Sequence, residues 1–247
     1  MAIKLSNRTK LIKPSPTLSL SAKAGQMKEA GIDVISFGVG EPDFNTPDYI
    51  KQAAHKALDA NFTRYTANAG IPDLKKAICA KLLRDNGLEY TPKDILVSPG
   101  AKASIINILI AACDTDDQVL IPSPYWVSYP YQALLADAVP VCIPTREEDA
   151  YKLQAEDLAA AIAASPCAKV LMLNSPNNPT GTVYTRDELS AIAELSVKHD
   201  ILVISDEIYE RLVYDDTKHI SIASLSPEIK ERTVVINGVS KAYAMTG

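Results

Sequence analysis

Short apolar runs alternate with helix-like segments along most of this chain, and this alternation limits its possible folds more than any other feature. Six runs rich in β-branched residues predict strands, at residues 95–98, 118–121, 139–143, 169–173, 201–205 and 233–236. Most are apolar throughout rather than alternating, as expected of strands that are covered by helices on both faces of a sheet. The pattern therefore predicts an α/β fold with a largely parallel sheet.

Helix signals lie between these runs. Residues 46–48 predict a helix start, with a capping threonine and then a proline at the first helical position. A second helix is predicted from Pro72 to an Asn-Gly stop at 86–87, and residues 185–188 fit a capping box. Helices are also expected at residues 101–113, 154–164 and about 18–30. We interpret residues 1–45 as an arm that leads into a main domain at 46–247.

Charge and cysteine spacing exclude several classes of protein. The net charge is −5, with no basic tract that would indicate nucleic acid or an anionic membrane. The four cysteines form no CxxC, which favours buried thiols in a reducing, cytoplasmic setting. No signal peptide is recognisable, and the apolar stretch at 105–113 is too short to cross a bilayer. None of the three histidines adjoins a nucleophile motif, so a hydrolase triad is not expected.

Polar residues follow the ends of several predicted strands, where ligands bind in open α/β sheets. Residues 98–102, Ser-Pro-Gly-Ala-Lys, open a helix whose N–H groups suit a phosphate, although a simple turn is the alternative. They do not match a nucleotide P-loop. Residues 174–181, with two prolines and a final glycine, form a rigid turn that can hold Asn178 as a donor. An ordinary turn without a function is the alternative there.

Two further strand ends carry groups suited to cofactor chemistry. Asp206 ends an apolar run and Tyr209 follows three residues later, so a carboxylate can pair with a cationic ring nitrogen while a phenol donates nearby. The alternative for Asp206 is a helix N-cap. Lys241 follows the last run, where a partly desolvated lysine can lose its proton and attack a carbonyl. The alternative for Lys241 is an ordinary solvated surface charge.

Together these segments resemble the fold-type I aminotransferases, and specifically the aspartate aminotransferase family. The resemblance covers essentially the whole chain, and it implies a three-layer α/β/α fold with a mostly parallel mixed sheet. The matching strings are Gly40-Glu41-Pro42-Asp43-Phe44, Arg64-Tyr65, Ser123-Pro124-Tyr125-Trp126, residues 174–181, Ser205-Asp206-Glu207-Ile208-Tyr209, Ser240-Lys241 and Ala244-Met245-Thr246-Gly247.

The resemblance implies a pyridoxal 5′-phosphate cofactor and assigns four residues to its chemistry. Lys241 would hold the cofactor as a Schiff base and later move a proton at the substrate. Asp206 would keep the pyridine nitrogen protonated, and Tyr209 and Asn178 would hydrogen-bond the ring oxygen.

The same resemblance assigns the surroundings of the cofactor and the substrate. Trp126 would cover the ring and contact substrate, as would Gly40 through its backbone. Tyr65 would reach the cofactor phosphate of a neighbouring subunit, which implies a homodimer with shared sites. Further phosphate contacts are implied for Gly100, Ala101, Lys102 and Ser240. Acidic substrates, namely aspartate with 2-oxoglutarate and also prephenate, are implied by Lys13, Thr17 and Lys102.

The chain departs from the family pattern in two places. Gly238 stands where members commonly carry a serine or threonine that binds the phosphate, which leaves Ser240 as the alternative ligand. The family also continues beyond Gly247 into a small C-terminal domain that grips the substrate carboxylate. The resemblance therefore implies that this domain is absent, and we expect residues 1–247 to transaminate poorly by themselves.

Other functions remain as alternatives. Within the fold type these are an alanine or aromatic aminotransferase or a carbon–sulfur lyase. A protein that binds the cofactor without turnover is an alternative from another class. A dinucleotide-dependent dehydrogenase lacks support, because the glycines at 38 and 40 have neither the required spacing nor a helix directly after them.

Overall fold

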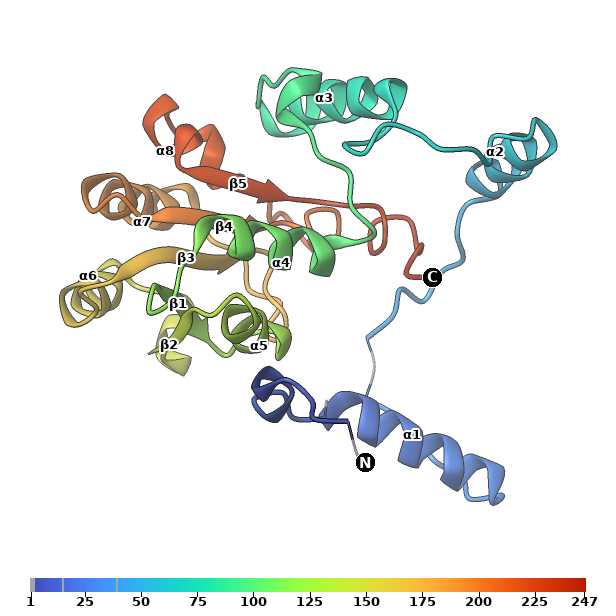
Figure 1. Ribbon diagram of the computed structural model, residues 1–247, viewed down its shortest axis with the longest axis horizontal. Coiled ribbons are helices and arrows are strands. Elements are labelled where there is room, and N and C mark those ends of the chain that lie inside the picture. The colour runs from blue at the N-terminus through green and yellow to red at the C-terminus, as the bar shows by residue number, and fades with distance from the viewer. Residues whose placement is uncertain (1–2, 15, 39) are drawn as a thin grey trace.

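The computed structural model describes residues 3–14, 16–38 and 40–247, and also leaves the side chains of residues 16–18 undescribed (Figure 1). The predicted role of Thr17 therefore concerns a side chain outside the described part. The helices are η1 (Asn7–Lys10), α1 (Pro16–Glu29), α2 (Asp48–Asp59), α3 (Pro72–Asn86), η2 (Pro92–Asp94), α4 (Ala101–Ala112), α5 (Ser128–Leu135), η3 (Glu147–Asp149), α6 (Ala155–Ala164), α7 (Arg186–Lys198), η4 (Ile222–Ser224) and α8 (Pro227–Glu231). The strands are β1 (Gln118–Ser123), β2 (Val139–Pro144), β3 (Ala168–Asn174), β4 (Leu202–Asp206) and β5 (Thr233–Ile236).

The strands form one five-stranded sheet in the order β2-β1-β3-β4-β5. All four strand pairs are parallel, so no antiparallel strand is found in the described residues. The last residues of three neighbouring strands align, since Asn174 lies opposite Asp206 and Asp206 opposite Ile236. The segments that follow these three strands therefore begin at the same edge of the sheet, as expected of parallel strands.

Helices cover both faces of the sheet, which confirms the predicted α/β fold (Figure 1). On β4, Val203 belongs to a core with α6, α7 and α8, while its neighbour Ile204 belongs to a second core with α4 and α5. This division follows from the two-residue period of a strand, which turns successive side chains to opposite faces. Both cores are apolar, and this explains why the strands are apolar without alternation.

Three predictions about local structure were wrong. Residues 95–98 are not a strand, because Val97 donates its N–H to the carbonyl of Ala69 at 3.1 Å rather than to a neighbouring strand. Pro47 is the N-cap of α2 rather than its first helical residue. The Thr46 hydroxyl does not cap that helix, because it donates to the carbonyl of Ala244 at 2.6 Å. Helices α5 and α8 were not predicted at all.

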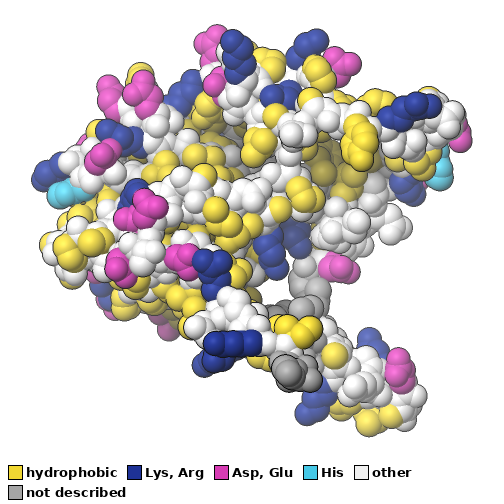
Figure 2. All heavy atoms as spheres, in the orientation of Figure 1, with side chains coloured by type: hydrophobic (Ala, Val, Ile, Leu, Met, Phe, Trp, Pro, Cys, Tyr) yellow, Lys and Arg dark blue, Asp and Glu magenta, His cyan; other side chains and the backbone are white. Residues whose placement is uncertain are grey.

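The N-terminal helix stands apart from the sheet. Figure 2 shows the α1 region projecting from the body of the molecule, at the lower right. Ahead of it, Arg8 ties η1 to the main domain by donating to both carboxylate oxygens of Asp137, at 3.2 and 2.6 Å. Within the described part of the chain, no helix is both long and apolar enough to cross a membrane.

The capping box at the start of α7 is confirmed. Thr185 accepts the N–H of Glu188 at 3.3 Å, and the Glu188 carboxylate accepts the N–H of Thr185 at 2.7 Å. Thr185→Ala should lower the free energy of unfolding by about 1 kcal/mol, the usual cost of losing an N-cap side chain. Urea denaturation measures this change, with the exposed Thr217→Ala as a control that should stay within about 0.5 kcal/mol of wild type. Equal stability of the two variants would show that this cap contributes nothing.

Candidate functional site

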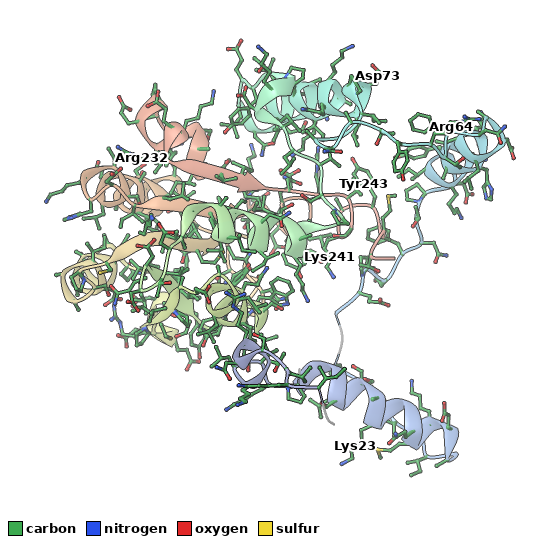
Figure 3. All side chains as sticks on the ribbon, viewed as in Figure 1. Lys23, Arg64, Asp73, Arg232, Lys241 and Tyr243 are labelled. Atoms are coloured by element: carbon green, nitrogen blue, oxygen red, sulfur yellow. The ribbon has the colours of Figure 1, made fainter. Side chains whose placement is uncertain are left out.

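The candidate site lies at the carboxyl edge of the sheet. Asn174 ends β3, Asp206 ends β4, and the chain after β5 leads to Lys241. Figure 3 shows Lys241 beyond the arrowhead of β5, in the segment that runs toward the C-terminus. The helix α4 begins at the same side of the sheet (Figure 1). The predicted convergence of polar groups from separate strands is therefore seen in the structure.

Asp206 is a buried carboxylate with two hydrogen-bond donors. Its side chain is held by the Tyr129 hydroxyl, which donates to Oδ2 at 2.7 Å, and by the Ile208 N–H, which donates to Oδ1 at 3.2 Å. Burial raises the pKa of Asp206 to about 6, while these two donors act to lower it and the neighbouring Glu207 acts to raise it. The two oxygens retain lone pairs for a further donor. Such a group is suited to pair with a cation inside the site.

Tyr209 and Asn178 are brought together as predicted. The Asn178 side-chain N–H donates to the Tyr209 hydroxyl oxygen at 3.3 Å, which leaves the phenol its own proton to donate. Asn174 fixes this pair to β4, because it donates to the Asp206 carbonyl at 2.8 Å and accepts the Asn178 N–H at 2.8 Å. Burial raises the pKa of Tyr209, so the phenol stays protonated near neutral pH. The sequence did not reveal this role of Asn174.

Lys241 lies beside Tyr209. Its Nζ is 5.9 Å from the centroid of the Tyr209 ring and donates to the carbonyl of Gly40 at 3.4 Å. The segment after β5 is turned back on itself, since the N–H of Met245 bonds to the carbonyl of Ser240 at 2.9 Å. The amine of Lys241, the predicted nucleophile, therefore lies close to both the Tyr209 ring and the backbone of Gly40. Ser240 belongs to the same turn as Lys241.

The start of α4 has the form of an anion site. Gly100 is its N-cap with φ +91°, a backbone conformation that favours glycine, and a Cβ added there would meet no atom within 4 Å. The first N–H groups of a helix have no partners inside the helix, and Ala101 and Lys102 occupy these positions. The ammonium of Lys102 lies 4.8 Å from the centroid of the Trp126 ring, a cation–π contact.

Helix α5, absent from the sequence prediction, supplies the site with two residues that we did not anticipate. Tyr129 holds Asp206, and the Gln132 side chain donates to the carbonyl of Lys102 at 2.8 Å. Trp126 meets Tyr129 edge to face, with ring centroids 5.4 Å apart. Tyr129 and Gln132 lie three residues apart on one side of α5, and Trp126 lies three residues before Tyr129, just ahead of the helix. That spacing, counted from Trp126, was the available signal.

Two predicted residues are not brought to this edge. Tyr65 is fully exposed, and Figure 3 shows its neighbour Arg64 beside α2, away from Lys241. Lys13 is exposed between η1 and α1. Neither shows an interaction with the residues above within the described ranges. At Gly238, a Cβ would come within 2.9 Å of Ile208 Cδ1, so any larger residue there would require the end of the Ile208 side chain to shift.

Removing the Tyr129 hydroxyl should raise the pKa of Asp206 above its present value of about 6. The reason is that Tyr129→Phe deletes a hydrogen bond to the charged form, while the ring still fills the same space. NMR titration of the Asp206 side-chain carbon in the cofactor-free protein measures the change. Tyr131→Phe on the same helix is the control, and an unchanged Asp206 titration in Tyr129→Phe would contradict this prediction.

Comparisons with known proteins agree with this geometry. A family model described as aminotransferase class I and II matches residues 32–247. The aspartate aminotransferase of Geobacillus stearothermophilus is 48% identical over 245 residues, which cover 99% of this chain and 62% of that protein. The probable aspartate/prephenate aminotransferase of Aquifex aeolicus is 48% identical over 98% of this chain and 61% of its own length.

Solved structures show the same likeness. The aspartate aminotransferase from Rhizobium meliloti superposes with a TM-score of 0.95 at 41% identity, covering 100% of this chain and 61% of that one. The Thermus thermophilus aspartate aminotransferase with maleate gives 0.94 at 42% identity, covering 100% and 63%. This chain thus spans a little over three fifths of the length of these relatives.

Proposed function

Because the chain belongs to the aminotransferase class I and II family, we propose that it binds pyridoxal 5′-phosphate and acts in transamination between L-aspartate and 2-oxoglutarate, giving oxaloacetate and L-glutamate. The observation that carries this proposal is the meeting of Lys241, Asp206 and Tyr209 at one edge of the sheet. We further propose residues 46–247 as the cofactor-binding domain, with residues 1–45 as an arm.

The residues present fit the cofactor. Asp206 offers a buried carboxylate for the ring nitrogen, and the Tyr209–Asn178 pair offers a donor for the ring oxygen. The start of α4 behind Gly100 offers N–H groups for the phosphate, and Lys241 offers the amine for the aldehyde. When bound, pyridoxal phosphate supplies a cationic ring that accepts the electron pair from the α-carbon of the substrate.

The chain's own groups perform the remaining tasks. Asp206, ionised above its pKa of about 6, would hold a proton on the ring nitrogen through a buried ion pair. Tyr209 would donate its phenol proton to the ring oxygen, with Asn178 fixing its orientation. The Lys241 amine would take and return the proton at the substrate α-carbon. Trp126 would cover one face of the cofactor ring, and its edge-to-face contact with Tyr129 would hold it in position.

Acidic substrates are supported by the comparisons and by charge. The relatives are named for aspartate or for aspartate and prephenate, and one solved neighbour contains maleate, a dicarboxylate. In this chain, Lys102 would provide a cationic group for such substrates, and prephenate is the further acceptor. The same role for Lys13 stays a prediction from the sequence, because the structure does not bring Lys13 to this edge of the sheet. A homodimer is also part of the proposal, because the fully exposed Tyr65 is free to reach a second subunit. The cytoplasmic location expected from the sequence remains a prediction.

Trapping the cofactor tests the proposal. The protein is mixed with pyridoxal phosphate, reduced with borohydride and digested, and mass spectrometry should find the pyridoxyl group on Lys241. Unreduced protein is then mixed with L-aspartate, L-alanine or L-tyrosine, and the visible absorbance of the bound cofactor should change most with aspartate. A response to tyrosine alone would favour an aromatic aminotransferase, and the absence of any adduct on Lys241 would refute cofactor binding as proposed.

A further inference from the structure

Glu207 is a fully buried carboxylate to which the function proposed above gives no role. It follows Asp206, the last residue of β4, and it bonds to the side chain of Ser205, which points to the opposite face of the sheet from that of Asp206. Burying a charge is costly unless it is paired and hydrogen-bonded. The residues around Glu207 are therefore expected to supply hydrogen bonds or an opposite charge.

Three side chains from two segments hydrogen-bond to Glu207. Its Oε1 accepts the hydroxyls of Ser205 at 2.8 Å and Ser221 at 2.7 Å. Its Oε2 lies 2.9 Å from Nε2 of His219, a side chain that is 7% exposed. Glu207 also donates its own N–H to the carbonyl of Ile236 at 2.8 Å. One residue thus joins the end of β4, the end of β5 and the segment before η4.

A second carboxylate continues this network to α3. Glu210, which is 8% exposed, is paired with the ammonium of Lys81 and accepts the Asn86 side-chain N–H at 3.0 Å. Glu207, Glu210 and His219 bring possible ligand atoms within 4.8 Å of one another, but all three already have hydrogen-bond or ion-pair partners. The three side chains therefore form a hydrogen-bonded cluster in which Nδ1 of His219 is the buried atom that has no partner among the described residues.

We propose that Glu207 is a positioning residue: its carboxylate anchors the segment that carries Asp206 and Tyr209 to the segment before η4, through Ser221 and His219. Asp206 and Tyr209 lie on either side of Glu207 in the chain. Lys241 follows five residues after Ile236, whose carbonyl accepts the backbone N–H of Glu207. This role rests on the function proposed above, because it concerns the placement of the same three groups.

Glu207→Gln tests the anchor with little change of volume, and Glu188→Gln is the matched control. Glu188 also caps a segment and pairs with a lysine, Lys152 at 2.7 Å, but it belongs to the distant start of α7. The first measurement is hydrogen–deuterium exchange of the cofactor-free chain, at a temperature where circular dichroism shows both variants folded. Glu207→Gln should increase exchange in peptides covering residues 205–211, whereas Glu188→Gln should not.

The second measurement follows the bound cofactor. Glu207→Gln should weaken pyridoxal phosphate binding by about tenfold, the effect expected when a supporting partner is removed. It should also raise the pH at which the visible absorbance of the lysine-linked cofactor changes, because a displaced Tyr209 donates less well to the ring oxygen. If Glu207→Gln acted only by removing a nearby negative charge, that pH would fall instead. The reason is that the protonated, cationic form of the lysine-linked cofactor would be less favoured.

The outcomes separate the two proposals. Unchanged exchange at residues 205–211 would overturn the anchor, and an absorbance transition that stays in place or moves to lower pH would overturn the positioning role. If wild type forms no adduct at Lys241, the proposed function fails and the positioning role fails with it. The exchange experiment would still report whether the anchor itself exists.

Discussion

Lys241→Ala is expected to abolish the borohydride-trapped pyridoxyl adduct completely, because among the described residues the Lys241 amine is the one that lies over the Tyr209 ring. Aspartate-dependent product formation, which we expect to be slow already for residues 1–247 by themselves, should fall by about a further 10²–10⁴-fold, the contribution of a positioned group that moves a proton. The measurements are peptide mapping after reduction and a coupled assay for oxaloacetate.

Lys198→Ala is the matched control, since this exposed lysine ends α7 and has no place in the proposed site. The control should keep the adduct on Lys241 in the same yield as wild type. An adduct of equal yield on another lysine in Lys241→Ala would show that the nucleophile is misassigned.

Asp206→Asn is expected to weaken cofactor binding by about 100-fold, or ~3 kcal/mol, because a buried ion pair with the ring nitrogen loses its anion. The substitution keeps the shape of the side chain, and an amide oxygen can still accept the Tyr129 proton. Titration with pyridoxal phosphate, followed by absorbance, measures the loss. Binding as tight as that of wild type would remove Asp206 from the proposed site.

The same substitution should stabilise the cofactor-free protein at high pH. The pKa of Asp206 is raised from its ordinary 3.8 to about 6, so the folded protein binds this proton more tightly than the unfolded chain does. The free energy of unfolding therefore falls as the pH rises from about 4 to about 6, and it stays at the lower level above pH 6. At 1.36 kcal/mol per pKa unit, this group accounts for a loss of about 2–3 kcal/mol. Thermal melts should show Asp206→Asn gaining on wild type at pH 8 and losing that advantage near pH 4.

The sequence was informative where one local signal decides the structure. The five strands of the sheet were all predicted, because their continuous apolar character reflects the two cores on either side. The capping box at Thr185 and the glycine after α3 were predicted as well, since each depends only on near neighbours in the chain. Asp206, Tyr209 and Asn178 were candidates because they follow strand ends that share an edge, and the family resemblance then supplied their expected roles.

The rest depends on partners that are distant in the sequence. The Thr46 hydroxyl bonds to Ala244 rather than capping α2, and no pattern near Thr46 indicates this choice. Tyr129 was missed because its partner Asp206 lies 77 residues away and because α5 is short, with only eight residues. Glu207 was quoted only as part of a motif, since a buried anchor is defined by His219 and Ser221, which meet it only in the folded chain.

The two adjacent carboxylates at the end of β4 also restrict how this chain can vary in length. Asp206 contacts Tyr129 on one face of the sheet, while Glu207 contacts His219 and Ser221 on the other. A deletion or insertion of one residue within β4 would exchange the faces of every side chain after it. Glu207 would then turn toward α5 and Asp206 toward the serines. Loops elsewhere can lose or gain residues, but the number of residues in this strand decides which acid is available to a ligand.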